Sequence, residues 1–144
     1  MMNKGGNDGF NNNSTASLEE LLKKLNRTDW TISILAIGLL QAVLNIYKAY
    51  QIKIKTIKKI NKVTPEELEE FNKWLDNLKG VVFFITVYIS LSFILINSNN
   101  LEDKLYYHGN EKNNEDVYQA YRDVWSSVII LIGVLIGGPG NPET

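Results

Sequence analysis

The chain has 144 residues, with 15 basic and 16 acidic residues and a formal net charge of −1, which suits a single domain. The charge balance argues against a nucleic-acid partner, and the absence of cysteine excludes disulfides, thiol catalysis and Cys-based metal or haem sites. Charged residues avoid three windows, residues 30–47, 80–101 and 124–142. The predicted fold class is therefore all-α, an integral membrane protein with about three transmembrane helices.

Two segments precede the first uncharged window. Residues 1–16 are rich in Gly and Asn, have little to bury, and are predicted to form a disordered tail. Residues 17–27 are predicted to form a short amphipathic helix, because Ser17 and Glu20 have capping-box spacing and the four leucines share one face. Two interpretations stay open for this helix: it lies on a membrane surface, or it packs on another protein segment.

Residues 28–144 are predicted to form a membrane domain with spans at about 30–48, 80–98 and 120–138. A helix needs about 20 residues to cross a hydrocarbon core of about 30 Å. Thr28 offers a cap for the first span, and aromatic residues at both ends of this window suit the two membrane interfaces.

A lysine-rich segment follows the first span. Residues 52–55 alone alternate like a strand, but directly after a long helix a helical continuation into the lipid headgroups is favoured. There the lysine stems can extend toward anionic lipid. The predicted headgroup residues are Lys48, Lys55, Lys58, Lys59 and Lys62. The alternative is a solvated helix face that contacts no lipid.

The strongest local signal lies between the first two spans, which we expect to be joined by a long Lys-rich helical hairpin. Thr64 suits an N-cap, Pro65 suits the first helical position, and Glu67 completes a capping box. One long helix is predicted from Pro65 to about Ile96, ended by the asparagines of residues 97–100. On its apolar half, Thr86, Ser90 and Asn97 line one side together with Phe83 and Phe93.

The third span is the shortest. Asn114 is a candidate cap, and Gly137, Gly138 and Pro139 are predicted to stop the helix. The apolar part is long enough to cross a membrane only if residues 117–121 continue the helix through the interface. A re-entrant or buried helix is the alternative.

The spans also carry residues typical of close helix packing. Two glycines at GxxxG spacing lie in the third span, and small and amide residues share about a third of the first helix. The predicted packing residues are Gly38, Gln41, Ala42, Asn45, Gly133 and Gly137. Because amides in lipid need hydrogen-bond partners, the face of the first helix should meet another helix, either within the chain or from a partner.

Few residues suggest chemistry. His108 is the single histidine and lacks the partners that a metal site or a general base requires. No catalytic, cofactor-binding or metal-binding set is predicted, and the chain is not expected to be an enzyme. The three uncharged windows of the spans hold no acidic or basic side chain, which argues against a transporter acting alone.

Lysine distribution predicts an orientation. Residues 48–79 carry eight Lys and five acidic residues, whereas residues 97–123 carry three basic and six acidic residues. The positive-inside rule places residues 48–79 on the cytoplasmic or matrix side and the N-terminus on the opposite side. Abundant Lys, Asn and Ile are typical of an AT-rich genome, so the host membrane is a bacterial plasma membrane or a protist organelle membrane.

The leading functional hypothesis is a small non-catalytic membrane protein that acts through helix packing as an accessory or assembly subunit of a larger complex, such as an energy-transducing one. Its partners are then the lipid bilayer and other membrane subunits. The alternative is a homo-oligomeric pore former, because the topology resembles that of one group of phage holins, although residues 139–144 lack the basic charge usual there. An enzyme using the interfacial Lys and Glu residues, and a soluble helical bundle, are the remaining alternatives.

Overall fold

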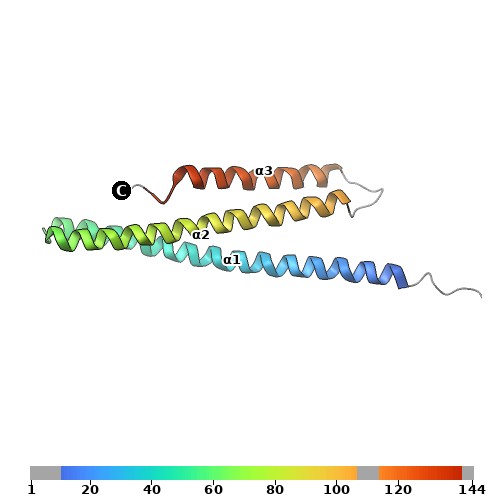
Figure 1. Cartoon of the computed structure of the whole chain (residues 1–144), viewed down its shortest axis with the longest axis horizontal. Helices are drawn as coiled ribbons and strands as arrows, with labels where there is room; N and C mark the ends of the chain where they lie inside the picture. Colours follow the sequence, from blue (N-terminus) through green and yellow to red (C-terminus); the bar gives the residue numbers. More distant parts are fainter. Residues whose placement is uncertain (1–10, 107–113, 141–144) are drawn as a thin grey trace, which may run out of the picture. The chain divides into compact units, whose positions relative to one another are not determined.

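The computed structural model describes residues 11–106 and 114–140, which form three α-helices (Figure 1). They are α1 (Asn11–Ile60), α2 (Pro65–Tyr106) and α3 (Asn114–Gly137). The all-α prediction is confirmed over these residues, and each helix is long and apolar enough to cross a membrane. The chain divides into two units, Met1–Ser33 and Ile34–Thr144, which are described separately below.

The described part of the first unit is entirely helical. Helix α1 already begins at Asn11, so residues 11–16 are helical where a disordered tail was predicted, while residues 1–10 lie outside the described residues. The predicted separation of residues 17–27 from the first span is also not seen. Thr28 Oγ1 donates to the carbonyl oxygen of Lys24 at 2.9 Å, so this hydroxyl bonds within the helix instead of capping a new one.

In the second unit, α1 continues through the lysine-rich segment and ends in a Schellman turn. Val63 N donates to Lys58 O at 3.4 Å, and Lys62 N donates to Lys59 O at 3.2 Å. Lys62 occupies the left-handed position of this turn, with φ of 52°. Glycine is the residue that usually takes this position, because a Cβ makes it sterically unfavourable.

Helix α2 begins where the sequence predicts. Pro65 is its first residue, and Glu67 N donates weakly to Thr64 Oγ1 at 3.4 Å. The Glu67 carboxylate binds Lys58 Nζ of α1 at 2.9 Å. The cap therefore fixes the start of α2, while the acidic side chain ties it to α1.

The far end of α2 differs from the prediction. The helix does not stop at residues 97–100 but continues to Tyr106. The Asn97 carboxamide bonds to α3 instead of competing for its own backbone, so it does not end the helix. Helix propensity is a weak prior that such a tertiary contact overrides.

Helix α3 begins at Asn114 and ends at Gly137, as predicted. Gly138 follows with φ of +59°, and its N–H donates to Val134 O at 3.0 Å. Residues 117–121 belong to the same helix as the apolar segment. The continuity that the third predicted span requires is therefore present.

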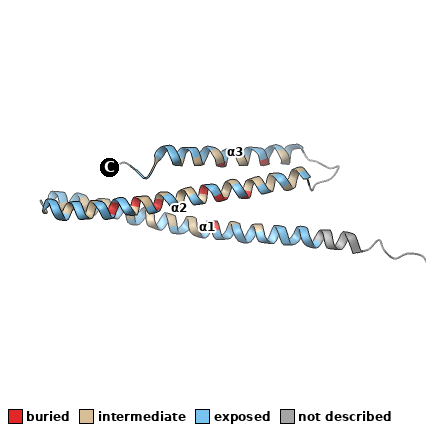
Figure 2. Ribbon diagram, in the orientation of Figure 1, coloured by how far each residue is buried: buried red, intermediate tan, exposed pale blue. Residues whose placement is uncertain are grey.

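Most buried residues lie on α2 (Figure 2). Helix α3 lies beside α2, and residues of α1 after Ile34 also contact α2 (Figure 1). The buried residues are Ile34, Leu75, Lys79, Val82, Ser90, Ser92, Ile96, Ala120 and Ser127. Four of these nine are polar, whereas many large apolar side chains on all three helices are exposed.

Candidate functional site

A polar contact joins α1 to α2. Gln41 Nε2 of α1 donates to Thr86 Oγ1 of α2, and Thr86 Oγ1 in turn donates to Val82 O one turn earlier at 2.8 Å. The hydroxyl thus accepts from the amide and still satisfies its own proton. Gln41, one of the predicted packing residues, therefore bonds to another helix of the same chain.

The same arrangement joins α2 to α3. Asn97 Nδ2 donates to Ser127 Oγ at 2.7 Å and reaches Asp123 O at 3.3 Å. Ser127 Oγ donates to Asp123 O at 2.9 Å. Ala120, which is 1% exposed, lies two helical turns before Ser127. Small buried residues of this kind let two helix backbones approach closely.

Aromatic and charged side chains join α1 and α2 nearer the turn. The ring of Trp74 packs edge-on against Tyr47, with centroids 6.0 Å apart, and lies 5.8 Å from Phe71. Lys58 Nζ lies 5.4 Å from the centre of the Phe71 ring while it binds Glu67. This group of contacts fixes how the lysine-rich part of α1 packs on α2.

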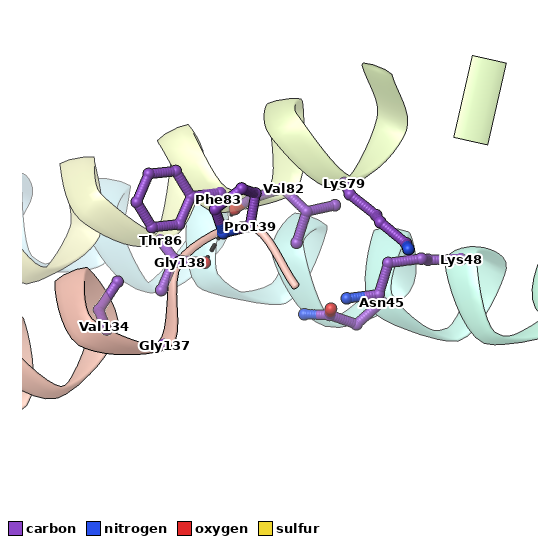
Figure 3. A pocket seen from close by; sticks show the side chains of 10 residues that line it. All are labelled: Asn45, Lys48, Lys79, Val82, Phe83, Thr86, Val134, Gly137, Gly138 and Pro139. Atoms are coloured by element: carbon purple, nitrogen blue, oxygen red, sulfur yellow. Dashed lines mark hydrogen bonds between the residues drawn. The ribbon is translucent and has the colours of Figure 1, made fainter. Parts of the chain in front are cut away.

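A cavity of about 230 Å³ lies where the three helices meet (Figure 3). We call it the basic pocket, because Lys48 of α1 and Lys79 of α2 line it. Asn45 and Thr86 add polar atoms, and the turn at residues 137–139 closes the side nearest α3. Figure 3 shows the side chains of Lys48, Lys79 and Asn45 converging on one region.

Asn45, a further predicted packing residue, is half-buried and lines the basic pocket, whereas the three predicted glycines have open space around them among the described residues. A Cβ added to Gly38, Gly133 or Gly137 would meet no atom of residues 11–106 and 114–140 within 4 Å. Gly133 and Gly137 are exposed on α3, and Ala42 is exposed on α1. The α2–α3 contact uses Ala120 and Ser127 instead of the glycines. Their seven-residue spacing is a signal that a search for GxxxG does not detect.

The five lysines predicted to meet lipid headgroups occupy different environments. Lys58 is engaged with Glu67 and Phe71, and Lys48 lines the basic pocket. Lys55 is half-buried, whereas Lys59 and Lys62 are exposed near the turn. Their proximity to lipid stays a prediction.

Lys79 was not among the residues singled out from the sequence. Its side chain is 6% exposed, and Nζ lies 3.9 Å from Asp76 Oδ1. A lysine directly before an apolar segment is usually assumed to extend into solvent. Lys48 of α1 and the turn at residues 137–139 line the same cavity as Lys79, a neighbourhood that the sequence does not reveal.

In the described chain, residues 11–106 and 114–140, no group of three His, Asp or Glu side chains could hold a metal ion. His108 lies outside the described residues. No protein-family model, no curated protein and no solved structure matches the chain. Function therefore has to be argued from the helices and from the contacts between them.

Proposed function

We propose that the chain is an integral membrane protein. The observation that carries this proposal is the distribution of side chains: polar residues such as Ser90, Ser92 and Ser127 are buried, and large apolar residues are exposed along all three helices. In water, such exposed apolar area would mark an aggregation-prone or partner-bound surface. In lipid it is the expected arrangement, because the hydrocarbon solvates apolar side chains and polar groups must find partners inside the protein.

The basic pocket supports the proposal that all three apolar segments end at the same membrane interface. Asn45 and Lys48 lie at the end of the first apolar segment, Lys79 lies just before the second, and residues 137–139 follow the third. All of them line one cavity, so three segments far apart in the sequence change from apolar to polar at one place. Three spans with a shared interface require this coincidence.

We further propose that the protein acts without catalysis, as an accessory or assembly subunit of a larger membrane complex. Gly133 and Gly137 support this role, because they lie one turn apart on an exposed part of α3 and no described residue comes within 4 Å of a Cβ added to either. A helix of another subunit can approach such a face closely. Gln41 and Asn97 bond within the chain and so provide no polar wall for a pore, which favours this role over a homo-oligomeric pore.

Capture of partners from solubilised host membranes tests the role. Replacing both glycines, Gly133→Ile with Gly137→Ile, should abolish co-purification of partners and leave the monomer folded, since none of the residues that the structure describes occupies that space. The matched control is Ile132→Phe with Ile136→Phe, which adds bulk at the same spacing on another exposed part of α3. Unchanged capture by the glycine variant, or migration of the native chain alone, contradicts the proposed role.

The proposed orientation places residues 48–79 on the cytoplasmic or matrix side and the N-terminus on the other side. Lys59 is exposed beside the turn, and the chain has no cysteine of its own, so Lys59→Cys introduces a unique label site. A membrane-impermeant maleimide should label this site in inverted vesicles and not in intact cells or organelles. Labelling from the outer side of intact membranes reverses the topology.

A further inference from the structure

We propose that residues 18–32 of α1 pair with the same segment of a second copy of this chain, as a parallel coiled coil. Almost all of this segment is exposed among the described residues (Figure 2). Within it, residues at alternating spacings of three and four follow the a and d pattern of a coiled coil. We call these residues the α1 seam: Leu18, Leu21, Leu25, Thr28 and Ile32. Its four apolar members are each between 58% and 61% exposed.

The polar residues around the α1 seam are arranged as a coiled coil requires. With Leu18 at a and Leu21 at d, the charged residues Glu19, Glu20, Lys23 and Arg27 fall at the outer positions b, c and f. Glu19 and Lys23 form an ion pair within the helix, with 3.3 Å between Oε1 and Nζ. Thr28, at a d position, donates its hydroxyl to the carbonyl oxygen of Lys24 at 2.9 Å. The hydroxyl proton is thus already bonded and needs no partner inside the seam.

The continuity of the helix argues against the interpretation that this segment lies on the membrane surface. A surface helix would have to turn sharply where the predicted first span begins, near residue 30. Sharp kinks occur at Pro, at Gly, at π-bulges or where a group inserts into the helix. Residues 18–33 contain no Pro or Gly and are α-helical throughout. The leucines therefore continue along the helix beyond the hydrocarbon, where an exposed apolar stripe marks a protein interface.

Charge complementarity identifies the partner as a second copy. In a parallel coiled coil, the g residue of one helix lies beside the e residue of the following heptad of the other helix, five positions later. Lys24 is at a g position, and Asp29, five residues later, is at an e position. Both residues are exposed. Two identical helices in register therefore bring Lys24 of each copy beside Asp29 of the other copy.

The parallel direction rests on the membrane location proposed above. Two copies inserted with the same topology have α1 helices that point the same way, and a symmetric pair then has its twofold axis along the membrane normal. In the second unit, the same spacing continues in the sequence at exposed residues: Leu35, Leu39, Ala42 and Ile46. Ala42, a predicted packing residue, is small enough for close approach of two helices.

Disulfide cross-linking tests the pairing, because the chain has no cysteine of its own. Leu25→Cys lies at an a position, where two copies in register face each other across the axis. Asn26→Cys is the matched control, because Asn26 is also exposed but lies at the outer position b. The full-length variants are oxidised in vesicles at a low protein-to-lipid ratio, so that random collisions are rare. Leu25→Cys should form a covalent dimer, and Asn26→Cys should not.

Charge reversal tests the second copy without changing the apolar residues. Lys24→Glu and Asp29→Lys, each alone, should weaken self-association about threefold to tenfold, because each places like charges at both contacts. The double variant, Lys24→Glu with Asp29→Lys, should recover the native affinity. Residues five apart on one helix are not neighbours, so this recovery reports contact between copies. Energy transfer between dye-labelled Lys59→Cys chains, at increasing lipid dilution, measures the affinity.

Lys23→Glu is the control for charge reversal, because it makes the same change of net charge at an outer position and should leave self-association unchanged. Equal weakening by Lys23→Glu and Lys24→Glu overturns the proposal, and so does a double variant that fails to recover. Equal cross-linking at residues 25 and 26, or none at either, also overturns it. A cross-link of Leu25→Cys to a different protein in host membranes assigns the α1 seam to that protein instead.

Carbonate washing separates this inference from the membrane location on which its direction rests. A chain that stays in washed membranes but shows no seam-specific cross-link refutes the pairing alone. A chain that is washed off refutes the membrane location and, with it, the parallel direction. Cross-linking of Leu25→Cys in a retained chain, with recovery by the double charge reversal, is the result that the pairing predicts.

Discussion

The hydrogen bond between Asn97 and Ser127 should measurably stabilise the packing of α2 on α3. The 2.7 Å contact between Asn97 Nδ2 and Ser127 Oγ is short, and the same amide reaches Asp123 O at 3.3 Å. The perturbation is a double-mutant cycle of Asn97→Ala and Ser127→Ala. Each single change also removes atoms and other contacts, and the cycle cancels these contributions, leaving the interaction between the two side chains.

The expected magnitude follows from the environment of the bond. Hydrogen bonds between membrane helices average about 0.6 kcal/mol in such cycles and reach about 1.7 kcal/mol. The short distance places this bond in the upper part of that range, so a coupling of about 1–1.5 kcal/mol is expected. Asn97→Ala alone should cost more, because it also removes the contact with Asp123 O and leaves a small cavity.

Reversible unfolding in mixed micelles, followed by tryptophan fluorescence, measures the cycle. A second cycle with Asn99→Ala and Ser126→Ala is the matched control, because both residues are exposed and Ser126 Oγ donates to Arg122 O at 2.8 Å. The control pair should be additive within about 0.5 kcal/mol. A coupling for Asn97 and Ser127 no larger than that of the control pair would refute the reasoning.

Three further predictions follow from the helix contacts. Lys62→Gly should stabilise the chain by up to about 1 kcal/mol in unfolding assays, because φ of 52° strains a residue with a Cβ, and a loss of stability would contradict this. Lys58→Met should cost less than about 1 kcal/mol, and the cost should fall as salt is added, since the ion pair with Glu67 is partly exposed; a large, salt-independent loss is the contrary result. Leu75→Ala should cost about 2–5 kcal/mol because Leu75 is 1% exposed, whereas Leu39→Ala, at a site 70% exposed, should change unfolding little; equal costs would count against the described packing.

Helix ends were predictable where the signal is local. Pro65 begins α2 because its fixed φ suits a first helical turn. Helix α3 ends at Gly137 because the next residue, Gly138, has a left-handed φ. The helix boundaries that were predicted wrongly lie at polar residues whose side chains can form more than one kind of hydrogen bond. Thr28 has capping chemistry, but its hydroxyl is satisfied inside the helix, and Asn97 is satisfied by α3. For Asn97 the contact with α3 decides between these options, and that contact cannot be read from the sequence.

The candidate site was predictable in part for the same reason. The sequence places Gln41, Thr86 and Asn97 on polar faces of apolar helices, and all three make contacts between helices. It does not reveal which helix each residue meets, because that depends on the register between helices. The basic pocket is a product of that register, since Lys48 and Lys79 are brought together by the packing of α1 on α2.

The central claim is that the apolar part of α2 lies in lipid. Because the chain lacks cysteine, Leu91→Cys in the middle of that part and Glu70→Cys before it each introduce one thiol. Maleimide reacts with the thiolate, which forms in water and not in hydrocarbon. In carbonate-washed membranes, Glu70→Cys should be labelled and Leu91→Cys should be protected until detergent is added. Equal labelling of both sites in a chain that stays dissolved without detergent would contradict the account.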